Sequence, residues 1–196
     1  MIEMKFIINF ESRTNLVASA GERFLSKLVL KKPALDIIIA PNIIDISNFK
    51  SKFNYPIIAQ HADKIATFRA SGYISPKALS KIGIIGTIVN SPYHRLGYNS
   101  ICDIIKENKK YGLLTFLYVY NQDEYIHSLV FDSEYIIIKI NNLDDLLKFK
   151  GLKQNIFIDY KIKDKQDIIS IRNFKPAGLV LEPNDNIFNL EIKDYA

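Results

Sequence analysis

Three charged residues lie at or just beyond the ends of three successive apolar runs in the second half of the chain. Lys139 lies near the end of one run, Asp159 ends the next, and Glu182 follows the last. In a parallel β/α barrel the carboxyl ends of the strands share one mouth, where enzymes place their catalytic groups. A lysine amine can form a Schiff base with a carbonyl compound. The spacing therefore allows imine chemistry at Lys139, an inference that rests on fold-level analogy.

Metal and redox chemistry have little support in the sequence. The three histidines, His61, His94 and His127, are dispersed, and Cys102 is the single cysteine. Zinc sites need several such ligands at close spacing, and a disulfide needs two cysteines. We therefore expect no metal, no cofactor and no internal disulfide, with Cys102 packed as a small apolar residue of a helix.

The elements that would position these residues alternate along the chain. Near-continuous apolar runs, typical of buried parallel strands, occupy 5–10, 36–40, 57–60, 86–89, 113–119, 135–140, 155–159 and 178–181. Helical patterns lie between them at 20–31, 44–49, from 75 onward, 99–110, 123–128, 143–149 and 165–173, and 187–192 could form a closing element. Eight such units predict an α/β protein, a compact closed (β/α)8 barrel that spans 1–196 as a single domain.

Two helix boundaries carry recognisable signals. Ser75 is expected to be the N-cap of one helix, with Pro76 in its first turn, where the missing N–H has no helical partner to lose. Gly112 is a plausible C-cap for the helix over 99–110.

Charge and hydropathy limit the classes of partner. The net charge is +5, but the lysines are scattered in runs no longer than two, such as Lys31-Lys32 and Lys109-Lys110. A nucleic-acid interface needs clustered positive charge, so nucleic acid is an unlikely partner. No signal peptide and no apolar run of 18 residues is visible, which predicts a cytoplasmic protein without a membrane partner.

The block over 55–96 resembles triosephosphate isomerase, most closely its compact archaeal form. The resemblance is carried by the segments 59–63, 71–75, 86–90 and 94–96, supported by 7–10, 39–41 and Asp45. It implies a TIM barrel, an isomerase ancestry, and a site built from an Asn-x-Lys motif, a histidine and a glutamate base.

The positions that the resemblance assigns to catalysis carry other residues. After the first strand the chain reads Asn9-Phe10-Glu11, with Glu11 in place of the lysine. After the fourth strand Ser91 replaces the histidine, and at the sixth Lys139 replaces the glutamate. A lysine is protonated at neutral pH unless strongly desolvated, so it is a poor base toward carbon.

Two apparent substitutes do not fill the gap. His94 lies three positions beyond Ser91 and is more readily explained as a surface or interface histidine than as a recruited catalyst. Glu182-Pro183 looks like the family's glutamate motif, but it follows the eighth expected strand rather than the sixth.

The phosphate site also departs from the family pattern. Beyond Gly112 the chain has only Gly151 and Gly178, neither at the carboxyl end of a strand, whereas the family aims backbone N–H groups of glycine-rich turns at the phosphate. Asp159 and Glu182 occupy those places. The connection over 141–154 is too short for a mobile lid plus a full helix, and the C-terminal helix is also expected to be short.

Glu11 and Lys139 each carry the opposite charge to the residue that the family has at the same position. We expect them to form a compensating ion pair across the barrel mouth, the alternative being two independent solvated charges.

The leading hypothesis is a non-catalytic, pseudoenzyme-like barrel with a binding or assembly role. The alternatives are a divergent isomerase that interconverts glyceraldehyde 3-phosphate and dihydroxyacetone phosphate, and a repurposed enzyme that uses Lys139. Candidate residues at the mouth are Asn9, Glu11, Gln60, Asn90, His94, Lys139, Asp159 and Glu182.

In the triosephosphate isomerase family, the loop that corresponds to residues 60–75 inserts into a neighbouring subunit. Ser71, Gly72 and Tyr73 of this chain resemble the tip of that loop. The resemblance therefore implies a homo-oligomer, either a dimer or a tetramer, with mixed assembly with a true isomerase as a further option. A merely exposed loop is the alternative.

Overall fold

The computed structural model describes residues 4–33, 35–64, 71–149 and 155–184. Its strands form one sheet in which every neighbouring pair is parallel, in the order β2-β1-β8-β7-β6-β5-β4-β3. The strands are β1 (Lys5–Asn9), β2 (Asp36–Ala40), β3 (Ile58–Ala59), β4 (Gly86–Val89), β5 (Leu114–Val119), β6 (Tyr135–Lys139), β7 (Ile156–Asp159) and β8 (Gly178–Leu181).

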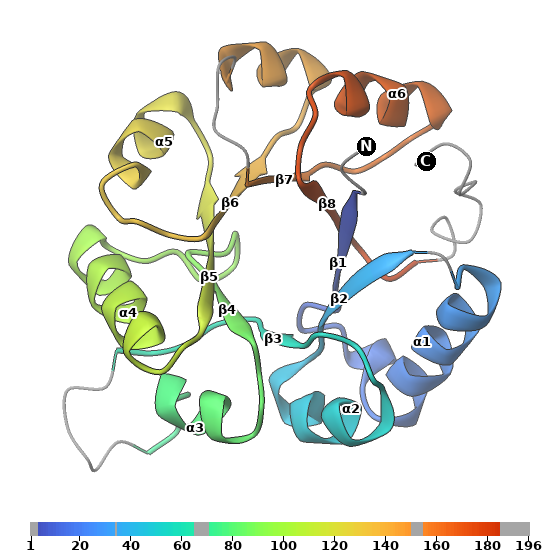
Figure 1. Ribbon diagram of the computed structural model, residues 1–196. Helices are drawn as coiled ribbons and strands as arrows, with labels where there is room; N and C mark the ends of the chain where they lie inside the picture. Colours follow the sequence, from blue (N-terminus) through green and yellow to red (C-terminus); the bar gives the residue numbers. More distant parts are fainter. Residues whose placement is uncertain (1–3, 34, 65–70, 150–154, 185–196) are drawn as a thin grey trace.

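The two ends of the sheet, β2 and β3, meet at a narrow seam. A parallel bridge joins Ile39 to Ile57, and the Ile39 N–H donates to the Pro56 carbonyl at 2.9 Å. Together with the outer helices this makes a (β/α)8 TIM barrel (Figure 1), and it confirms the predicted fold.

The helices surround the strands as Figure 1 shows. They are α1 (Ser19–Lys31), α2 (Ile46–Lys52), α3 (Pro76–Lys81), α4 (Tyr98–Lys110), α5 (Gln122–Ser128) and α6 (Lys165–Asn173), with the 3₁₀ turns η1 (Thr14–Leu16), η2 (Ile43–Asp45) and η3 (Leu143–Phe149). The predicted closing element over 187–192 and the shortened C-terminal helix lie outside the described residues.

Two local predictions are confirmed in position and differ in detail. The segment Leu143–Phe149 is a 3₁₀ helix rather than an α-helix. A 3₁₀ helix rises about 2.0 Å per residue, against 1.5 Å for an α-helix, so it covers more of the distance between β6 and β7 with few residues. Ser75 occupies the N-cap of α3 in extended conformation, but its side chain makes no capping hydrogen bond. Pro76 does lie in the first turn, and Gly112 follows α4 with φ +69°, as expected for a C-cap glycine.

The strands are buried on both faces, which explains why their apolar runs do not alternate with polar residues. Inside the barrel, the rings of Phe116, Tyr135 and Phe157 pack with centroids 4.7 to 5.8 Å apart. On the other face of β5, Leu117 and Val119 pack in the layer between strands and helices. The interior of the barrel is therefore a packed core. Buried polar residues lie at the mouth and elsewhere, including one cluster between α4 and the strands, where the Asn108 amide donates to the Thr87 and Thr115 hydroxyls.

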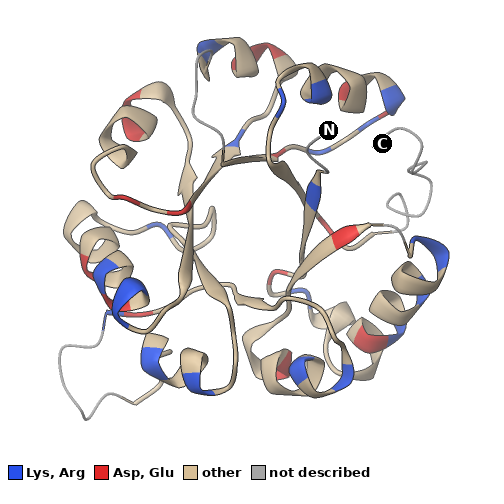
Figure 2. Cartoon of the chain, viewed as in Figure 1, with Lys and Arg blue, Asp and Glu red and all other residues tan. Residues whose placement is uncertain are grey.

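Charged residues lie mainly on the outer helices and loops, with both signs interspersed (Figure 2). This distribution matches a solvated surface and shows no single-sign stripe on the ribbon.

Candidate functional site at the barrel mouth

The centre of the mouth is a three-residue group on β5, β6 and β7. Lys139 and Asp159 end their strands in the same register, and the lysine Nζ lies 2.9 Å from Asp159 Oδ1. The Tyr118 hydroxyl donates to the other carboxylate oxygen at 2.8 Å. Both oxygens of Asp159 therefore have protein partners.

The expected ion pair between Glu11 and Lys139 is wrong. Lys139 pairs instead with Asp159, because that carboxylate sits at the same register on the adjacent strand. Glu11 lies 3.8 Å from Arg13 Nε, and Arg13 Nη2 lies 2.5 Å from Glu182 Oε2. Arg13 thus joins the two acidic residues that the sequence placed at the mouth. The sequence pattern did not predict this role for Arg13, although a positive side chain two positions after Glu11 is a usable signal.

Burial shifts the pKa of the acidic groups in this site. Loss of hydration raises the pKa of Asp159 above its usual value, with Lys139 acting in the opposite direction. Loss of hydration and the nearby charge of Glu182 raise the pKa of Glu11. The Tyr118 pKa is raised well above 10.0 by burial and by the Asp159 carboxylate, so its proton stays on the phenol.

Gln60 and Asn9 hold the backbone of the mouth. The Gln60 amide donates to the carbonyls of Glu11 at 2.9 Å and Ala40 at 3.2 Å. The Asn9 side chain accepts from the Glu11 N–H at 3.2 Å. Glu11 itself has φ +50°, in the left-handed region. These amides fix the turn after β1 rather than being left for a ligand.

Asn90 holds the turn after β4. Its φ is +62° and its side chain is buried. It donates to the Tyr118 carbonyl at 3.0 Å and accepts from the Leu96 N–H at 3.0 Å. The Tyr120 hydroxyl donates to the Asn90 carbonyl at 2.8 Å, which links the turn to β5.

The remaining predicted residues lie apart from the lysine group. The His94 ring packs against the His61 ring, with centroids 5.0 Å apart. The backbone N–H of His94 donates to the Ser91 carbonyl at 3.0 Å. Burial lowers the His61 pKa, and the neighbouring His94 acts in the same direction, while Asp63 opposes it. Among the residues that the structure describes, no hydrogen bond or ion pair joins Ser91 or His94 to the lysine group.

The loop expected to serve assembly is described only in part, since residues 65–70 lie outside the described ranges. Asp63 and Ile74 close its base: the Asp63 carboxylate accepts from the Ile74 N–H at 2.7 Å, and the Asp63 N–H donates to the Ile74 carbonyl at 2.9 Å. Ser71, Gly72 and Tyr73 are exposed. This geometry suits both an assembly loop and a simple surface loop.

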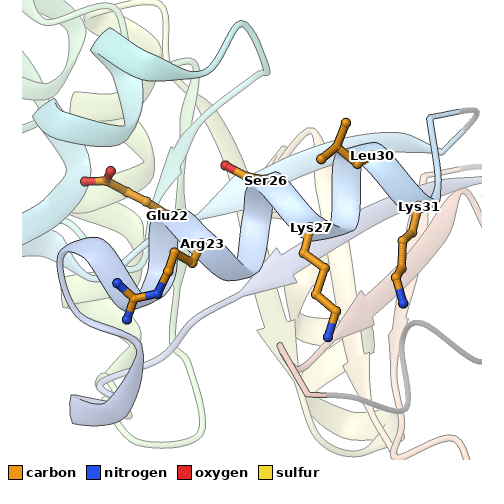
Figure 3. Close-up of a pocket in the computed structure, with 6 residues that line it drawn as sticks. All are labelled: Glu22, Arg23, Ser26, Lys27, Leu30 and Lys31. Atoms are coloured by element: carbon orange, nitrogen blue, oxygen red, sulfur yellow. The ribbon is translucent and has the colours of Figure 1, made fainter.

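Within the described residues, two hollows lie outside the Lys139 group, and the first of them borders the mouth at Asn90 and Tyr118. A cavity of about 170 Å³ lies beside β5 between α4 and α5. A wide surface hollow of about 460 Å³ runs along α1 (Figure 3), where Arg23, Lys27 and Lys31 line one side and Leu30 points to the other. The hollow on α1 lies on the outside of the barrel and brings no group to the mouth.

Within the described ranges, no group of three His, Cys, Asp or Glu side chains is arranged to hold a metal ion. The described helices include none long and apolar enough to cross a membrane.

The sequence model described as "Triosephosphate isomerase" matches residues 2–119. The chain belongs to the triosephosphate isomerase family. The match ends with β5, so Lys139, Asp159 and Glu182 lie beyond it.

Known relatives agree over the same part of the chain. The triosephosphate isomerase of Thermoplasma volcanium is 30% identical over 118 residues, which are 60% of this chain and 55% of that protein. That of Methanobacterium bryantii is 30% identical over 114 residues, 56% of this chain and 49% of that protein. The matched region thus spans about half the length of these relatives.

The fold is similar over nearly the whole chain. The crystal structure of triosephosphate isomerase from Bartonella henselae superposes with a TM-score of 0.72, covering 93% of this chain and 92% of that one at 12% identity. At that identity the likeness concerns the fold alone.

Proposed function

We propose that this protein is a triosephosphate isomerase family barrel that does not isomerise triose phosphates and that has a binding or assembly role. One observation carries the proposal: at the position that the family resemblance gives to the carboxylate base, a lysine lies 2.9 Å from a buried aspartate. An ammonium group in an ion pair has no lone pair with which to remove a proton from carbon.

The surrounding groups support the same proposal. Glu11, at the position expected for the substrate-binding lysine, carries a negative charge near Glu182 and would repel an anionic phosphate ester. Glu11 and Glu182 share Arg13, and Asp159 pairs with Lys139, so three carboxylates face two cations and the balance at the mouth stays unfavourable to an anionic phosphate ester.

The test is a coupled assay of glyceraldehyde 3-phosphate and dihydroxyacetone phosphate interconversion, run in both directions. The matched control is the Thermoplasma volcanium relative, prepared and assayed in the same way. We expect no rate above the buffer background for this protein. Isomerisation that survives purification and falls in Lys139→Met would overturn the proposal in favour of a divergent isomerase.

The Lys139 group also favours one second candidate, a barrel that binds carbonyl compounds as imines. The supporting observation is that the Lys139 amine lies at the end of β6 beside the Asp159 carboxylate, which also accepts from the Tyr118 phenol. Borohydride reduction in the presence of glyceraldehyde, followed by peptide mass spectrometry, should leave Lys139 unmodified if the ion pair keeps it protonated. Lys5, which pairs with Asp36, is the internal control. A stable adduct at Lys139 that does not form at Lys5 would support imine formation by Lys139.

We propose in addition that the chain assembles with copies of itself through the loop closed by Asp63 and Ile74. Native mass spectrometry of the protein purified from its own cells tests this. A homo-oligomer is expected, a mixed complex would identify an isomerase partner, and a monomer would show that the loop is only a surface feature.

A further inference from the structure

The cavity between α4 and α5 borders the barrel mouth at Asn90 and Tyr118, and much of its floor is apolar. Leu117 and Val119 come from the outer face of β5, Ile101 from α4, and Leu96 and Phe131 from the flanking loops. The Tyr98 ring packs at a tilt of 48° against Phe131, with centroids 4.8 Å apart, and extends this wall. Figure 1 shows α4 and α5 as neighbours outside β5.

One rim of the cavity is polar: Arg95 and Glu124 pair with each other there, and His127 and Ser128 also line it. Arg95 Nη2 lies 2.7 Å from Glu124 Oε1, and the Arg95 guanidinium lies 3.8 Å from the centre of the Tyr120 ring. The other Glu124 oxygen accepts from the Tyr120 N–H at 3.3 Å. Each carboxylate oxygen has a second lone pair, so Glu124 can still accept a hydrogen bond from a bound molecule.

The cavity wall is built before any ligand arrives. The buried Asn90 side chain fixes the turn after β4 through the Tyr118 carbonyl and the Leu96 N–H. Leu96, which lines the cavity, is therefore tied directly to that turn. A preformed wall lowers the ordering cost of binding.

The volume selects the size of the occupant. An enclosed apolar cavity of about 150 Å³ is enough to take up benzene, and this partly open, partly polar hollow has a similar volume of about 170 Å³. The matched pair of Arg95 and Glu124 gives no net attraction to an ion. We propose that this cavity binds a neutral ligand with one ring and one hydrogen-bonding group, such as a hydroxyl, directed at Glu124.

Phenol is the probe. Titration into the full chain, followed by methyl NMR, should give saturating shifts that are largest at Leu96, Ile101 and Leu117. Benzoate and benzylamine should bind at least tenfold more weakly, because each brings a net charge to a rim where Arg95 and Glu124 are already paired with each other. Shifts that spread over the surface without saturating would overturn the proposal.

A substitution pair and a soak complete the test. Leu96→Trp should fill the cavity and weaken phenol binding at least tenfold, whereas Leu129→Trp, at an exposed position just after α5, should leave it unchanged. A crystal soaked in 4-bromophenol should show the anomalous peak of bromine between Leu117 and Phe131, a readout that needs no variant. Unchanged affinity in a folded Leu96→Trp, or no peak in the cavity, would contradict the assignment.

Discussion

Lys139 and Asp159 stand at the same register on adjacent parallel strands, with the ammonium nitrogen 2.9 Å from one carboxylate oxygen. The aspartate is buried, while the lysine side chain is 31% exposed. Most of the cost of dehydrating this pair therefore falls on the carboxylate, and Lys139 and Tyr118 offset it.

Replacement of either partner should destabilise the fold, and the two losses should not add. Lys139→Met leaves a buried carboxylate without its cation, so we expect a loss of about 2–3 kcal/mol in the free energy of unfolding. Asp159→Asn leaves only a partly exposed ammonium, so about 1 kcal/mol is expected. Urea unfolding of both single variants and of the double variant measures the coupling. Strictly additive losses would show that the pair makes no net interaction.

Gly178 is required by close packing inside the barrel. A Cβ atom built there would lie 2.2 Å from the Lys5 carbonyl oxygen and 2.5 Å from the Phe157 ring. Gly178→Ala should therefore cost about 1–3 kcal/mol, as other overpacked cores do. Gly97→Ser is the control, because nothing lies within 4 Å of its added Cβ. Equal midpoints for the two variants in thermal unfolding would refute this account.

The backbone at Asn90 gives a third prediction. Asn90→Ala loses both side-chain hydrogen bonds and keeps a Cβ at φ +62°, so a loss of about 2–3 kcal/mol is expected. Asn90→Gly loses the same bonds but relieves the left-handed conformation, and it should be more stable than the alanine variant by about 1 kcal/mol. Chemical denaturation decides the order, and a glycine variant less stable than alanine would contradict it.

His61 should make the protein less stable in mild acid. Its pKa is lowered in the folded state by burial and by His94, so the unfolded chain binds the proton more readily. The contribution of neutral His61 to the free energy of unfolding is fully present above pH 6.5, the ordinary pKa of histidine. It is lost as the pH falls from 6.5 toward the lower pKa of His61 in the folded protein.

The measurement is the free energy of unfolding between pH 5 and 7.5. His61→Gln should flatten the decline between pH 6.5 and 5 relative to the parent protein. His127→Gln, at an exposed site on α5, should leave that decline in place. An unchanged slope in His61→Gln would assign the acid sensitivity to other groups.

The strands could be predicted from sequence because their faces are both buried, which leaves a continuous apolar run that marks each one. The partners of the charged side chains could not be predicted in the same way. The choice of Asp159 over Glu11 by Lys139 depends on the register between β6 and β7, which no local pattern records. Tyr118 was hidden within an apolar run, although its hydroxyl reaches the mouth.

The cavity depends on how far α4 and α5 stand from β5, a distance set by the packing of many side chains. It had no signal in the sequence. The turns of Glu11 and Asn90 were equally hidden, since a positive φ at a residue other than glycine is uncommon and is imposed by its surroundings.

The seam between β2 and β3 has one more consequence. Within the described residues, its ladder is a single isolated bridge, reinforced by the Gln60 side chain on the Ala40 carbonyl, whereas β1 and β8 are joined over their length. Amide hydrogens of Ile39 and of the backbone around it should therefore exchange with solvent by local opening, well before those of β1. The barrel should therefore open first between β2 and β3, and not between its first and last strands, β1 and β8.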